Sequence, residues 1–386
     1  MPKSPLAIYI HWPFCASLCP YCDFNSHVAN KIDHDTWAAA YISELRHWHV
    51  QMPEHEITSI FWGGGTPSLM QPQIVERILQ EIHRLWPVHE NVEITLEANP
   101  GSVEAEKLKD FAAAGINRVS LGVQSMRDDA FRFLGRRHSR DEAMAALEVA
   151  RQVFARTSAD FIYARAGQTV ADWQSELTEI LMLRLDHLSL YQLTIEPGTP
   201  FYMRAQKGEQ MTAGDDASAE MFELTQSMCA AENMPAYEIS NHARAGQASR
   251  HNLAYWEYGD YLGIGPGAHG RVTLGGIKHS TTTHRAPKIY LEKIATNGHG
   301  LHAPKKLSEN DMLQEMLMMG LRLTAGIPKS RIEHYAARKF NDVFAAAMLQ
   351  PFLDEKLIWI NKNAIGATPQ GAMKLNALTK SLITKI

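Results

Sequence analysis

The sequence predicts an α/β fold: a mainly parallel sheet covered by helices, followed by a smaller second domain. Two observations lead to this prediction. The first half of the chain alternates short apolar runs with longer amphipathic stretches, which is the pattern of repeated strand–helix units. In addition, the 386 residues, 45% of them hydrophobic and 21% charged, are enough to bury one large core and a second, smaller one.

Six apolar runs of strand length are expected to form the sheet. They cover Leu6–Ile10, Ile57–Trp62, Val92–Leu96, Val119–Val123, Ala159–Tyr163 and Leu188–Leu193. Helices are expected between them, at 34–50, 72–86, 103–114, 140–155 and 170–184, where apolar residues recur at intervals of three and four. Strands joined by helices lie parallel, so the loops after their carboxyl ends meet at one edge of the sheet. Chemistry is expected at that edge.

The character of the sequence changes near residue 240. A Gly-, His- and aromatic-rich stretch follows, and helical patterns return from Ser308 with a break at Gly326-Ile327-Pro328. The remaining elements are expected as helices at 330–338 and 341–354, a strand at Leu357–Ile360 and a turn at Asn361–Asn363. Together they predict a small helical, winged-helix-like domain.

Charge and hydropathy argue against two classes of protein. The chain has 38 basic and 42 acidic residues, and no Lys/Arg-rich run stands out beyond pairs such as Arg136-Arg137, so no nucleic acid is expected as the main partner. The first ten residues lack the apolar stretch of a secretory signal, and no window approaches the roughly 20 apolar residues that span a bilayer. The protein is therefore expected to be soluble and cytoplasmic.

Three of the four cysteines lie close together near the N-terminus. The segment His11-Trp-Pro-Phe-Cys15-Ala-Ser-Leu-Cys19-Pro-Tyr-Cys22 has a C-x3-C-x2-C pattern, which is too sparse for a disulfide framework. It offers three thiolates where an iron–sulfur cubane needs four ligands, so one iron is left open. An open position suits the amino and carboxylate groups of S-adenosylmethionine (SAM). The pattern predicts a cluster on Cys15, Cys19 and Cys22 with SAM at the exposed iron.

The alternative for these cysteines is a structural zinc ion with His11 or His27 as the fourth ligand. Zinc sites usually pair their ligands as two separated doublets, which disfavours this reading. The fourth cysteine, Cys229, falls in a helix-like run and is expected to be a buried thiol. The methionines at 312, 316, 318 and 319 have helical spacing and are expected to pack in a core.

Further polar groups are expected at the same edge of the sheet. The turn Trp62-Gly-Gly-Gly65-Thr66-Pro-Ser68 has backbone without side chains that can approach a ligand, although a plain strand–helix turn reads the same. Glu97, in Thr95-Leu-Glu-Ala-Asn-Pro100, is a strand-end carboxylate suited to ribose hydroxyls. Gln124, Arg136 and Asp160 can reach the same region.

Together these residues resemble one family. The motifs that carry the resemblance are Tyr9, the C-x3-C-x2-C loop with Tyr21, the Gly-Gly-Gly-Thr-Pro turn, Glu-x-Asn-Pro, Gly122-Val-Gln-Ser125 and the C-terminal Gly-Leu-Arg-Leu segment. They look like the coproporphyrinogen-dehydrogenase-like radical SAM family over nearly the full length. The resemblance implies an incomplete (β/α)6 radical SAM barrel with a [4Fe-4S] cluster and SAM as cofactors.

By motif, the resemblance also implies which residues bind SAM. They are Tyr9, Tyr21, Gly64, Gly65, Thr66, Glu97, Gln124, Arg136 and Asp160. One departure is Ala164-Arg165-Ala166, where many relatives have Gly-Leu-Pro, so the loop after Asp160 is expected to differ in shape. The implied division of the chain is a radical SAM core barrel over 1–238, a barrel-flanking segment over 239–304 and a C-terminal HemN-like helical domain over 305–386.

Several features favour the haem-chaperone branch of this family, HemW. The oxygen-independent coproporphyrinogen dehydrogenase has a fourth cysteine two residues after the cluster loop, where this chain has Phe24, and a long N-terminal extension before its first strand. HemW proteins carry an H-N-x-x-Y-W motif, present here as His251-Asn252-Leu-Ala-Tyr255-Trp256 and followed by Gly263-Ile-Gly-Pro-Gly-Ala-His269-Gly. Imidazole and phenol can ligate haem iron. Residues of these types also serve in core or interdomain packing.

The resemblance leaves two activities open. The first is a haem chaperone that binds haem through His251, Asn252, Tyr255 and Trp256 and transfers it to acceptor proteins, respiratory and membrane-associated ones among them. Here SAM cleavage is left open and no coproporphyrinogen dehydrogenation is expected. The second is oxygen-independent coproporphyrinogen III dehydrogenation by radical SAM chemistry. An unrelated radical SAM reaction is a third, because a fold does not fix a function. An electron donor such as a flavodoxin or ferredoxin is implied, and a homodimer is left open.

Overall fold

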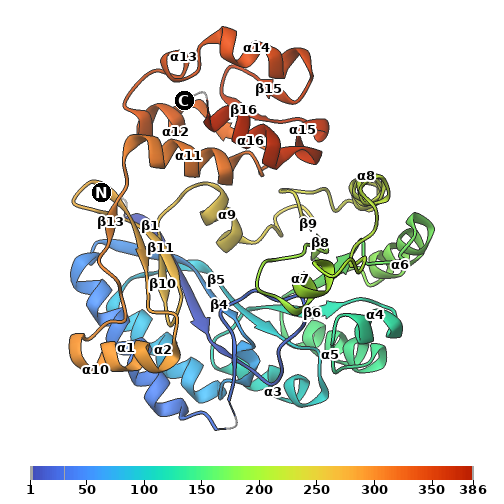
Figure 1. Cartoon of the computed structure of the whole chain (residues 1–386). Coiled ribbons are helices and arrows are strands. Elements are labelled where there is room, and N and C mark those ends of the chain that lie inside the picture. The colour runs from blue at the N-terminus through green and yellow to red at the C-terminus, as the bar shows by residue number, and fades with distance from the viewer. Residues whose placement is uncertain (1–2, 30, 385–386) are drawn as a thin grey trace.

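An eleven-stranded sheet forms the centre of the protein in the computed structural model, which describes residues 3–29 and 31–384 (Figure 1). The strand order is β13-β12-β11-β10-β1-β4-β5-β6-β7-β8-β9. The six strands from β1 to β8 in this order are parallel to one another. The expected domains include residues 1, 2, 30, 385 and 386, which lie outside the described residues.

The parallel strands confirm the six predicted apolar runs. They are β1 Ser4–Trp12, β4 His55–Gly64, β5 Val88–Ala98, β6 Arg118–Gln124, β7 Arg156–Tyr163 and β8 His187–Gln192. The predicted helices are also confirmed, as α1 His34–Gln51, α2 Pro72–Leu85, α3 Ser102–Ala113, α5 Arg140–Val153 and α6 Val170–Met182. Short additions are the 3-10 turn η1 Pro67–Leu69, α4 Asp128–Phe133 and α7 Pro200–Ala205, and the longer helix α8 covers Asp215–Ala231.

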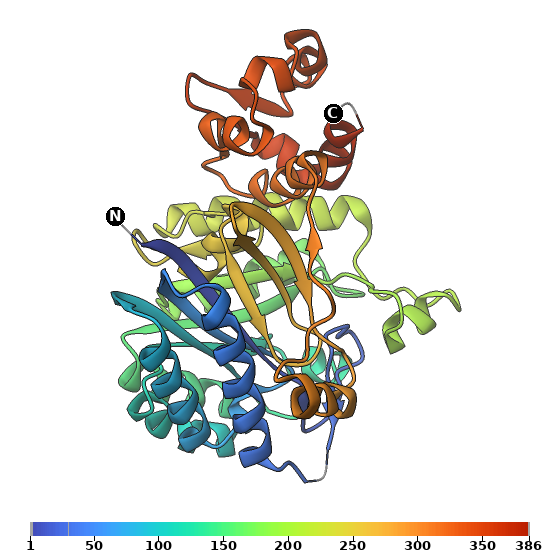
Figure 2. The same ribbon diagram turned by 90° about the vertical axis from the view of Figure 1, so that its left-hand side faces the viewer.

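The sheet continues beyond the predicted strands at both ends. β9 (Asn241–Ala243) pairs antiparallel with β8. At the other end β10 (Tyr261–Ile264) pairs parallel with β1, followed by the antiparallel strands β11 (His269–Leu274), β12 (Ile277–Thr282) and β13 (Lys305–Lys306). Figure 2 shows these strands beside β1. The order runs from one free edge to the other, so the sheet is an incomplete barrel, as the resemblance predicted.

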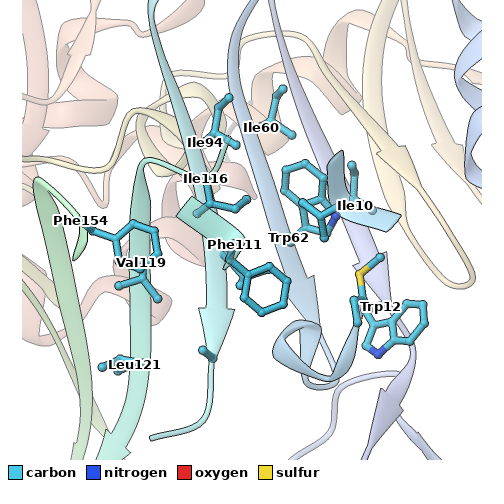
Figure 3. Packing of buried hydrophobic residues seen from close by; sticks show 14 of the residues in the cluster. Ile10, Trp12, Ile60, Trp62, Ile94, Phe111, Ile116, Val119, Leu121 and Phe154 are labelled. Atoms are coloured by element: carbon cyan, nitrogen blue, oxygen red, sulfur yellow. The ribbon is translucent and has the colours of Figure 1, made fainter. Parts of the chain in front are cut away.

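The side chains of the parallel strands alternate between two environments. Outward-facing residues such as Trp12 and Trp62 are fully buried under the helices, and Figure 3 shows them in one cluster with Phe111 of α3. Burial of each such side chain stabilises the fold by about 1.5–3 kcal/mol. The inward-facing positions, among them Tyr9 and Glu97, line cavities instead. Apolar packing on the outer face of the sheet therefore stabilises the fold, and the inner face is available for polar groups.

The C-terminal residues form a separate core over a small sheet. The helices are α11 Glu309–Gly320, α12 Lys329–Ala336, α13 Phe340–Val343, α14 Ala346–Asp354, α15 Pro369–Met373 and α16 Leu375–Ile383, and the antiparallel strands are β14 Ile327–Pro328, β15 Ile358–Ile360 and β16 Ala364–Ala367. The predicted helix 341–354 is two helices, because Phe344 is extended and buried between them. Met316 is buried as predicted, whereas Met318 is 54% exposed. Cys229 is a buried thiol of α8, as predicted.

This C-terminal core lies against the sheet through charged groups and a short helix, α9 (Arg250–Trp256). Figure 1 shows α9 between the two parts of the molecule, at the end of the sheet where β1 begins. Glu315 of α11 binds Arg271 of β11 at 2.7 Å and accepts a hydrogen bond from the Tyr258 hydroxyl at 2.8 Å. The Lys278 ammonium, 3.0 Å from Asp260, lies over the Tyr258 ring. Within the described residues, no helix has the length and hydropathy to cross a membrane.

Candidate functional site

A cavity of about 600 Å³ opens at the carboxyl ends of the parallel strands, and we name it the outer cavity. Its lining brings together the three clustered cysteines and most of the positions that the resemblance assigns to SAM. These residues are Cys15, Cys19, Cys22, Tyr21, Gly64, Gly65, Thr66, Glu97, Gln124, Arg136 and Asp160. They come from the cysteine loop, from β4, β5, β6 and β7 and the turn after β4, and, for Arg136, from the loop between α4 and α5. This is the edge at which the parallel topology places chemistry.

The three cysteines lie on one loop as separate, partly exposed thiols. Cys15 ends the short strand β2 (Phe14–Cys15), which pairs with β3 (His27–Val28), and the Cys22 amide donates to the Cys19 carbonyl at 3.2 Å. Burial raises the pKa of Cys15 and raises the pKa of Cys22 to about 11. A cluster that takes up these sulfurs must displace their protons, so its binding is expected to release protons.

Two side chains donate hydrogen bonds to the sulfurs. The Thr66 hydroxyl lies 3.5 Å from Cys15 Sγ, and Arg136 Nη1 lies 3.4 Å from Cys19 Sγ. Arg136 Nη2 is held by the Asn99 side-chain oxygen at 2.6 Å and by the Gly122 carbonyl at 2.9 Å. Such donors favour the thiolate form. Arg136 Nε is buried without a partner among the described residues, which leaves one donor for an anionic ligand such as a carboxylate.

The glycine turn after β4 holds the cysteine loop in place. The Gly65 amide donates to the Trp12 carbonyl at 2.7 Å, and the Thr66 amide donates to the Phe14 carbonyl at 2.8 Å. Gly64 has a φ of +106°, and a Cβ there would lie 2.5 Å from His11 Cε1. These glycines let the end of β4 approach the strand that leads into Cys15. Both amides are already used, so SAM binding at Gly64, Gly65 and Thr66 stays a prediction.

Two carboxyl groups, Glu97 and Asp160, line the outer cavity and interact electrostatically. Burial and the nearby Asp160 raise the pKa of Glu97 to about 8, and burial also raises the pKa of Asp160. The Ser120 hydroxyl donates to Asp160 Oδ1 at 3.1 Å. A protonated Glu97 is able both to donate to and to accept from a hydroxyl group. The pair therefore has the chemistry to bind a diol such as ribose, as the sequence predicted for Glu97.

A second cavity, of about 390 Å³, lies deeper in the barrel, and we name it the inner cavity. Its walls are Tyr9, His11, Phe61, His251, Asn252 and Tyr255, and its other lining residues are Phe24, Asn25, Gly64, Glu97, Gly267, His269 and Arg285. Phe24, Gly64 and Glu97 line both cavities. The two cavities therefore adjoin at Glu97. Tyr9, predicted to bind SAM, lines only the inner one.

The H-N-x-x-Y-W motif forms α9 and closes one side of the inner cavity. His251 is 1% exposed, and its Nδ1 and Nε2 lie 3.0 Å from the Ser59 hydroxyl and 2.7 Å from the Tyr255 hydroxyl. Burial lowers the pKa of His251 to about 3, so the ring is neutral. Asn252 Nδ2 donates to the Tyr237 hydroxyl at 3.3 Å. Both imidazole nitrogens are thus engaged within the protein.

Trp256, the last residue of the motif, lines neither cavity. The Arg322 guanidinium lies over its ring at 4.5 Å, and Arg322 also binds the fully buried Glu238 at 2.9 Å. Arg322 belongs to the Gly-Leu-Arg-Leu segment that follows α11. Two segments that the sequence marked separately therefore meet, and Trp256 has the interdomain position that the packing alternative expects.

The His11 ring is not free to be the fourth ligand of a zinc ion on the cysteine loop. Its Nε2–H donates to the Asn25 carbonyl at 2.9 Å, and its Nδ1 accepts from the Tyr9 hydroxyl at 3.0 Å. His27 keeps a buried Nε2 without a partner. Even so, no group of three or more His, Cys, Asp and Glu side chains converges on one metal position in the described part of the chain. Thiolates of a cubane ligate different irons and need not converge on one point.

Sequence reasoning missed several residues that build these cavities. Glu93, fully buried on β5, binds Arg156 at 2.5 Å and accepts from the His251 amide at 3.1 Å, which fixes the start of α9. Arg118, 2% exposed on β6, donates to the Thr95 hydroxyl at 3.4 Å. A charged residue at an inward position of an apolar strand was the available signal for both. Asn25 carried no comparable signal.

Comparison with known proteins gives the relatives of this chain. Residues 9–179 match the radical SAM superfamily model and residues 307–373 match the HemN C-terminal domain. The chain is 37% identical to heme chaperone HemW of Haemophilus influenzae, over all of both chains. It is 35% identical to heme chaperone HemW of Escherichia coli, over 92% of this chain and 90% of that one.

A mitochondrial protein and a solved structure are similar as well. Radical S-adenosyl methionine domain-containing protein 1 of Danio rerio is 33% identical over 98% of this chain and 87% of its own length. The coproporphyrinogen III oxidase HemN from Escherichia coli has a TM-score of 0.83 at 22% identity, covering all of this chain and 92% of that one, which shows a shared fold. Because the chain is 35–37% identical to these bacterial relatives over nearly its full length, it belongs to the HemW branch of the radical SAM superfamily.

Proposed function

We propose that this protein binds haem and transfers it to acceptor proteins, with an iron–sulfur cluster and SAM bound beside the haem site. The observation that carries the proposal is the junction of the two cavities at Glu97. The outer cavity has the groups for the cofactors, and the inner cavity is walled by His251, Asn252 and Tyr255 of a motif typical of HemW. Its bacterial relatives of near full length are named heme chaperones.

The outer cavity suits the two cofactors that the family implies. Cys15, Cys19 and Cys22 would hold a [4Fe-4S] cluster, because they are unbridged thiols on one loop. Arg136 would bind the SAM carboxylate through its unpaired Nε, and Glu97 with Asp160 would bind the ribose. Gln124, with a left-handed φ of 72°, and Tyr21 line the remaining wall. When bound and reduced, these cofactors supply an adenosyl radical.

The inner cavity suits a flat conjugated ligand. Phe61 stacks on the His251 ring at 5.0 Å and on Tyr9 at 6.4 Å, which forms a continuous aromatic wall. In this arrangement His251 contributes a neutral, hydrogen-bonded ring to the wall. Trp256 acts indirectly, because Arg322 covers it and connects α9 to the C-terminal domain. The partners are haem, its acceptors, among them respiratory and membrane-associated proteins, and a flavodoxin or ferredoxin as electron donor.

Phe24 favours haem transfer over coproporphyrinogen dehydrogenation. It stands where the dehydrogenase branch has a fourth cysteine, and its side chain, 59% exposed, borders both cavities. No thiol is therefore offered at this position. An apolar ring here suits a porphyrin face and has no proton to exchange with a substrate.

One experiment separates the two activities. Protein with its cluster is titrated with haem, followed by absorption, and is separately incubated without oxygen with reductant, SAM and coproporphyrinogen III. We expect saturable haem binding at one site and no protoporphyrinogen on chromatography. Protoporphyrinogen formation would establish the dehydrogenase instead, and the absence of saturable haem binding would refute the chaperone proposal.

A further inference from the structure

We propose that Arg285 and His269 form a carboxylate-binding site at the rim of the inner cavity, and that its ligand is a propionate group of haem. The inference rests on the proposed function and deepens it. It assigns a role to two residues outside the H-N-x-x-Y-W motif. Both residues line the inner cavity, and both have exposed side chains.

Arg285 differs from the paired arginines of the sheet. Arg156 and Arg271 bind Glu93 and Glu315, at 2.5 and 2.7 Å. The Arg285 guanidinium makes no ion pair with any carboxylate of the described residues. A guanidinium that borders a cavity without a partner is available for an anion, and its planar fork matches a carboxylate.

The charged neighbours that act on His269 and His11 are all basic. Burial lowers the pKa of His269, and Arg271 and Arg285 lower it further. Burial likewise lowers the pKa of His11, and the charged neighbours that act on it are His27, Arg285 and His269. No carboxylate contributes to either set. With their pKa values lowered, both imidazoles are neutral at neutral pH, so an anion at the rim would be attracted by the Arg285 guanidinium and would accept a hydrogen bond from the neutral His269 ring.

The backbone at Arg285 is fixed while its side chain remains available. Asn25 Nδ2 donates to the Arg285 carbonyl and to the Pro266 carbonyl, each at 2.9 Å. The Gly267 amide donates to the His284 carbonyl at 3.1 Å. Gly267 has a φ of +79°, and a Cβ there would lie 2.6 Å from Asn25 Nδ2, so only glycine allows this contact. Asn25, three residues after Cys22, thus positions the rim, which reduces the entropy lost when a ligand binds.

The rest of the inner cavity determines which kind of molecule can carry the carboxylate. Beyond the rim lie the rings of Phe24, Phe61, Tyr9 and Tyr255. Glu97 also lines the cavity; burial and the nearby Asp160 raise its pKa to about 8, so it is mostly protonated at neutral pH and does not repel an anion strongly. A cavity of about 390 Å³ is of the size that holds a small ligand or one edge of a larger one. A propionate on the edge of a porphyrin fits this combination.

The test compares haem with its dimethyl ester, in which both propionates are neutral. We expect the wild-type protein to bind haem about tenfold more tightly than the ester, as charge-assisted hydrogen bonds of this kind provide. Arg285→Gln should bring this ratio close to one, and Arg285→Lys should retain part of it. Lys288→Gln is the matched control, because it also removes one positive charge. Lys288 is exposed on α10 (Pro287–Asn297) and lines neither cavity.

The outcomes distinguish this inference from the proposed function. Saturable binding of haem and of the ester with equal affinity by the wild type would overturn the propionate site and leave haem binding standing. A loss in Arg285→Gln that is equal for both ligands would indicate a structural role and would also overturn it. Absence of haem binding by the wild type would refute both proposals. The melting temperature of each variant checks that it is folded.

Discussion

The outer and inner cavities lie on the same face of one sheet, and both are lined by residues that sequence motifs pick out, yet their polar groups are in different states. The outer cavity has three unbridged thiols and an arginine whose Nε has no hydrogen-bond partner among the described residues. In the inner cavity, both nitrogens of His11 and of His251 are hydrogen-bonded within the protein. The groups of the outer cavity are free for ligands, whereas these two histidines maintain the walls.

This difference shows that residue type alone does not identify a ligand. A thiol or a guanidinium without a partner gains when a ligand arrives, because its buried polar atom becomes satisfied. An imidazole with two hydrogen bonds must give one up before it can ligate iron, at a cost of about 1 kcal/mol or more. In the inner cavity the Arg285 guanidinium, at the rim, has no ion pair with a described residue, whereas both ring nitrogens of His251 are engaged.

The largest expected effect concerns the cysteine loop. Cys19→Ala should lose nearly all of the cluster, since two thiolates cannot hold a cubane. Iron and sulfide content together with visible absorption measure this. Cys229→Ala, which removes the buried thiol of α8, should keep the full cluster. A stoichiometric cluster on Cys19→Ala would contradict the assignment of the outer cavity.

The second effect concerns the attachment of α9 to the C-terminal domain. Arg322→Ala leaves the fully buried Glu238 without its cation and uncovers Trp256, so the free energy of unfolding should fall by about 2–3 kcal/mol. Arg331→Ala removes a 3.4 Å pair with the 48% exposed Glu257 and should cost less than about 1 kcal/mol. Denaturant unfolding measures both. Equal losses would mean that the contacts of Arg322 with Glu238 and Trp256 stabilise the protein no more than an exposed ion pair does.

The third effect is a pH dependence that belongs to the outer cavity. The pKa of Glu97 is about 8 in the folded protein and 4.5 in the reference state, so between these values the folded protein retains a proton that the unfolded chain has lost. The free energy of unfolding should therefore decrease as pH rises through this window. Glu97→Gln removes the decrease and should be more stable than the wild type near pH 8.

Urea unfolding of SAM-free protein across this pH range tests the expectation for Glu97. Glu90→Gln is the control, because Glu90 is an exposed residue of the same strand and its substitution should leave the pH profile unchanged. If Glu97→Gln and the wild type keep parallel profiles, the carboxyl group is not held protonated by burial and by Asp160.

The smallest effect concerns His251. Tyr255→Phe removes the hydroxyl that lies 2.7 Å from His251 Nε2 and should lower the free energy of unfolding by about 1 kcal/mol. If His251 is a wall residue, the absorption maximum of bound haem stays unchanged in this variant. A shift of that maximum would mean that the freed nitrogen ligates the iron. Tyr202→Phe, on α7 and outside both cavities, should change neither quantity.

The sequence by itself determined the parallel strands, the helices between them and the placement of chemistry after the strands. These features depend on local patterns: a periodicity of two or of about 3.6, and a spacing of three cysteines within one loop. Each pattern is contained in a short segment, so neighbouring residues suffice to read it. The Glu97 position followed from the same logic, because parallel strands bring their carboxyl ends to one edge, whereas the family resemblance implied Arg136 and Asp160 as SAM positions.

Only the tertiary structure decided how the segment after residue 240 is used. Its short, glycine-interrupted strands join the edge of β1, and strand pairing depends on which edge is free and not on local composition. The state of His251 depends on Ser59, 192 residues away, and that of Trp256 on Arg322. The rim at Arg285 depends on Asn25, 260 residues away. Whether a polar group is free or satisfied is a property of its partners, and here those partners come from distant parts of the chain.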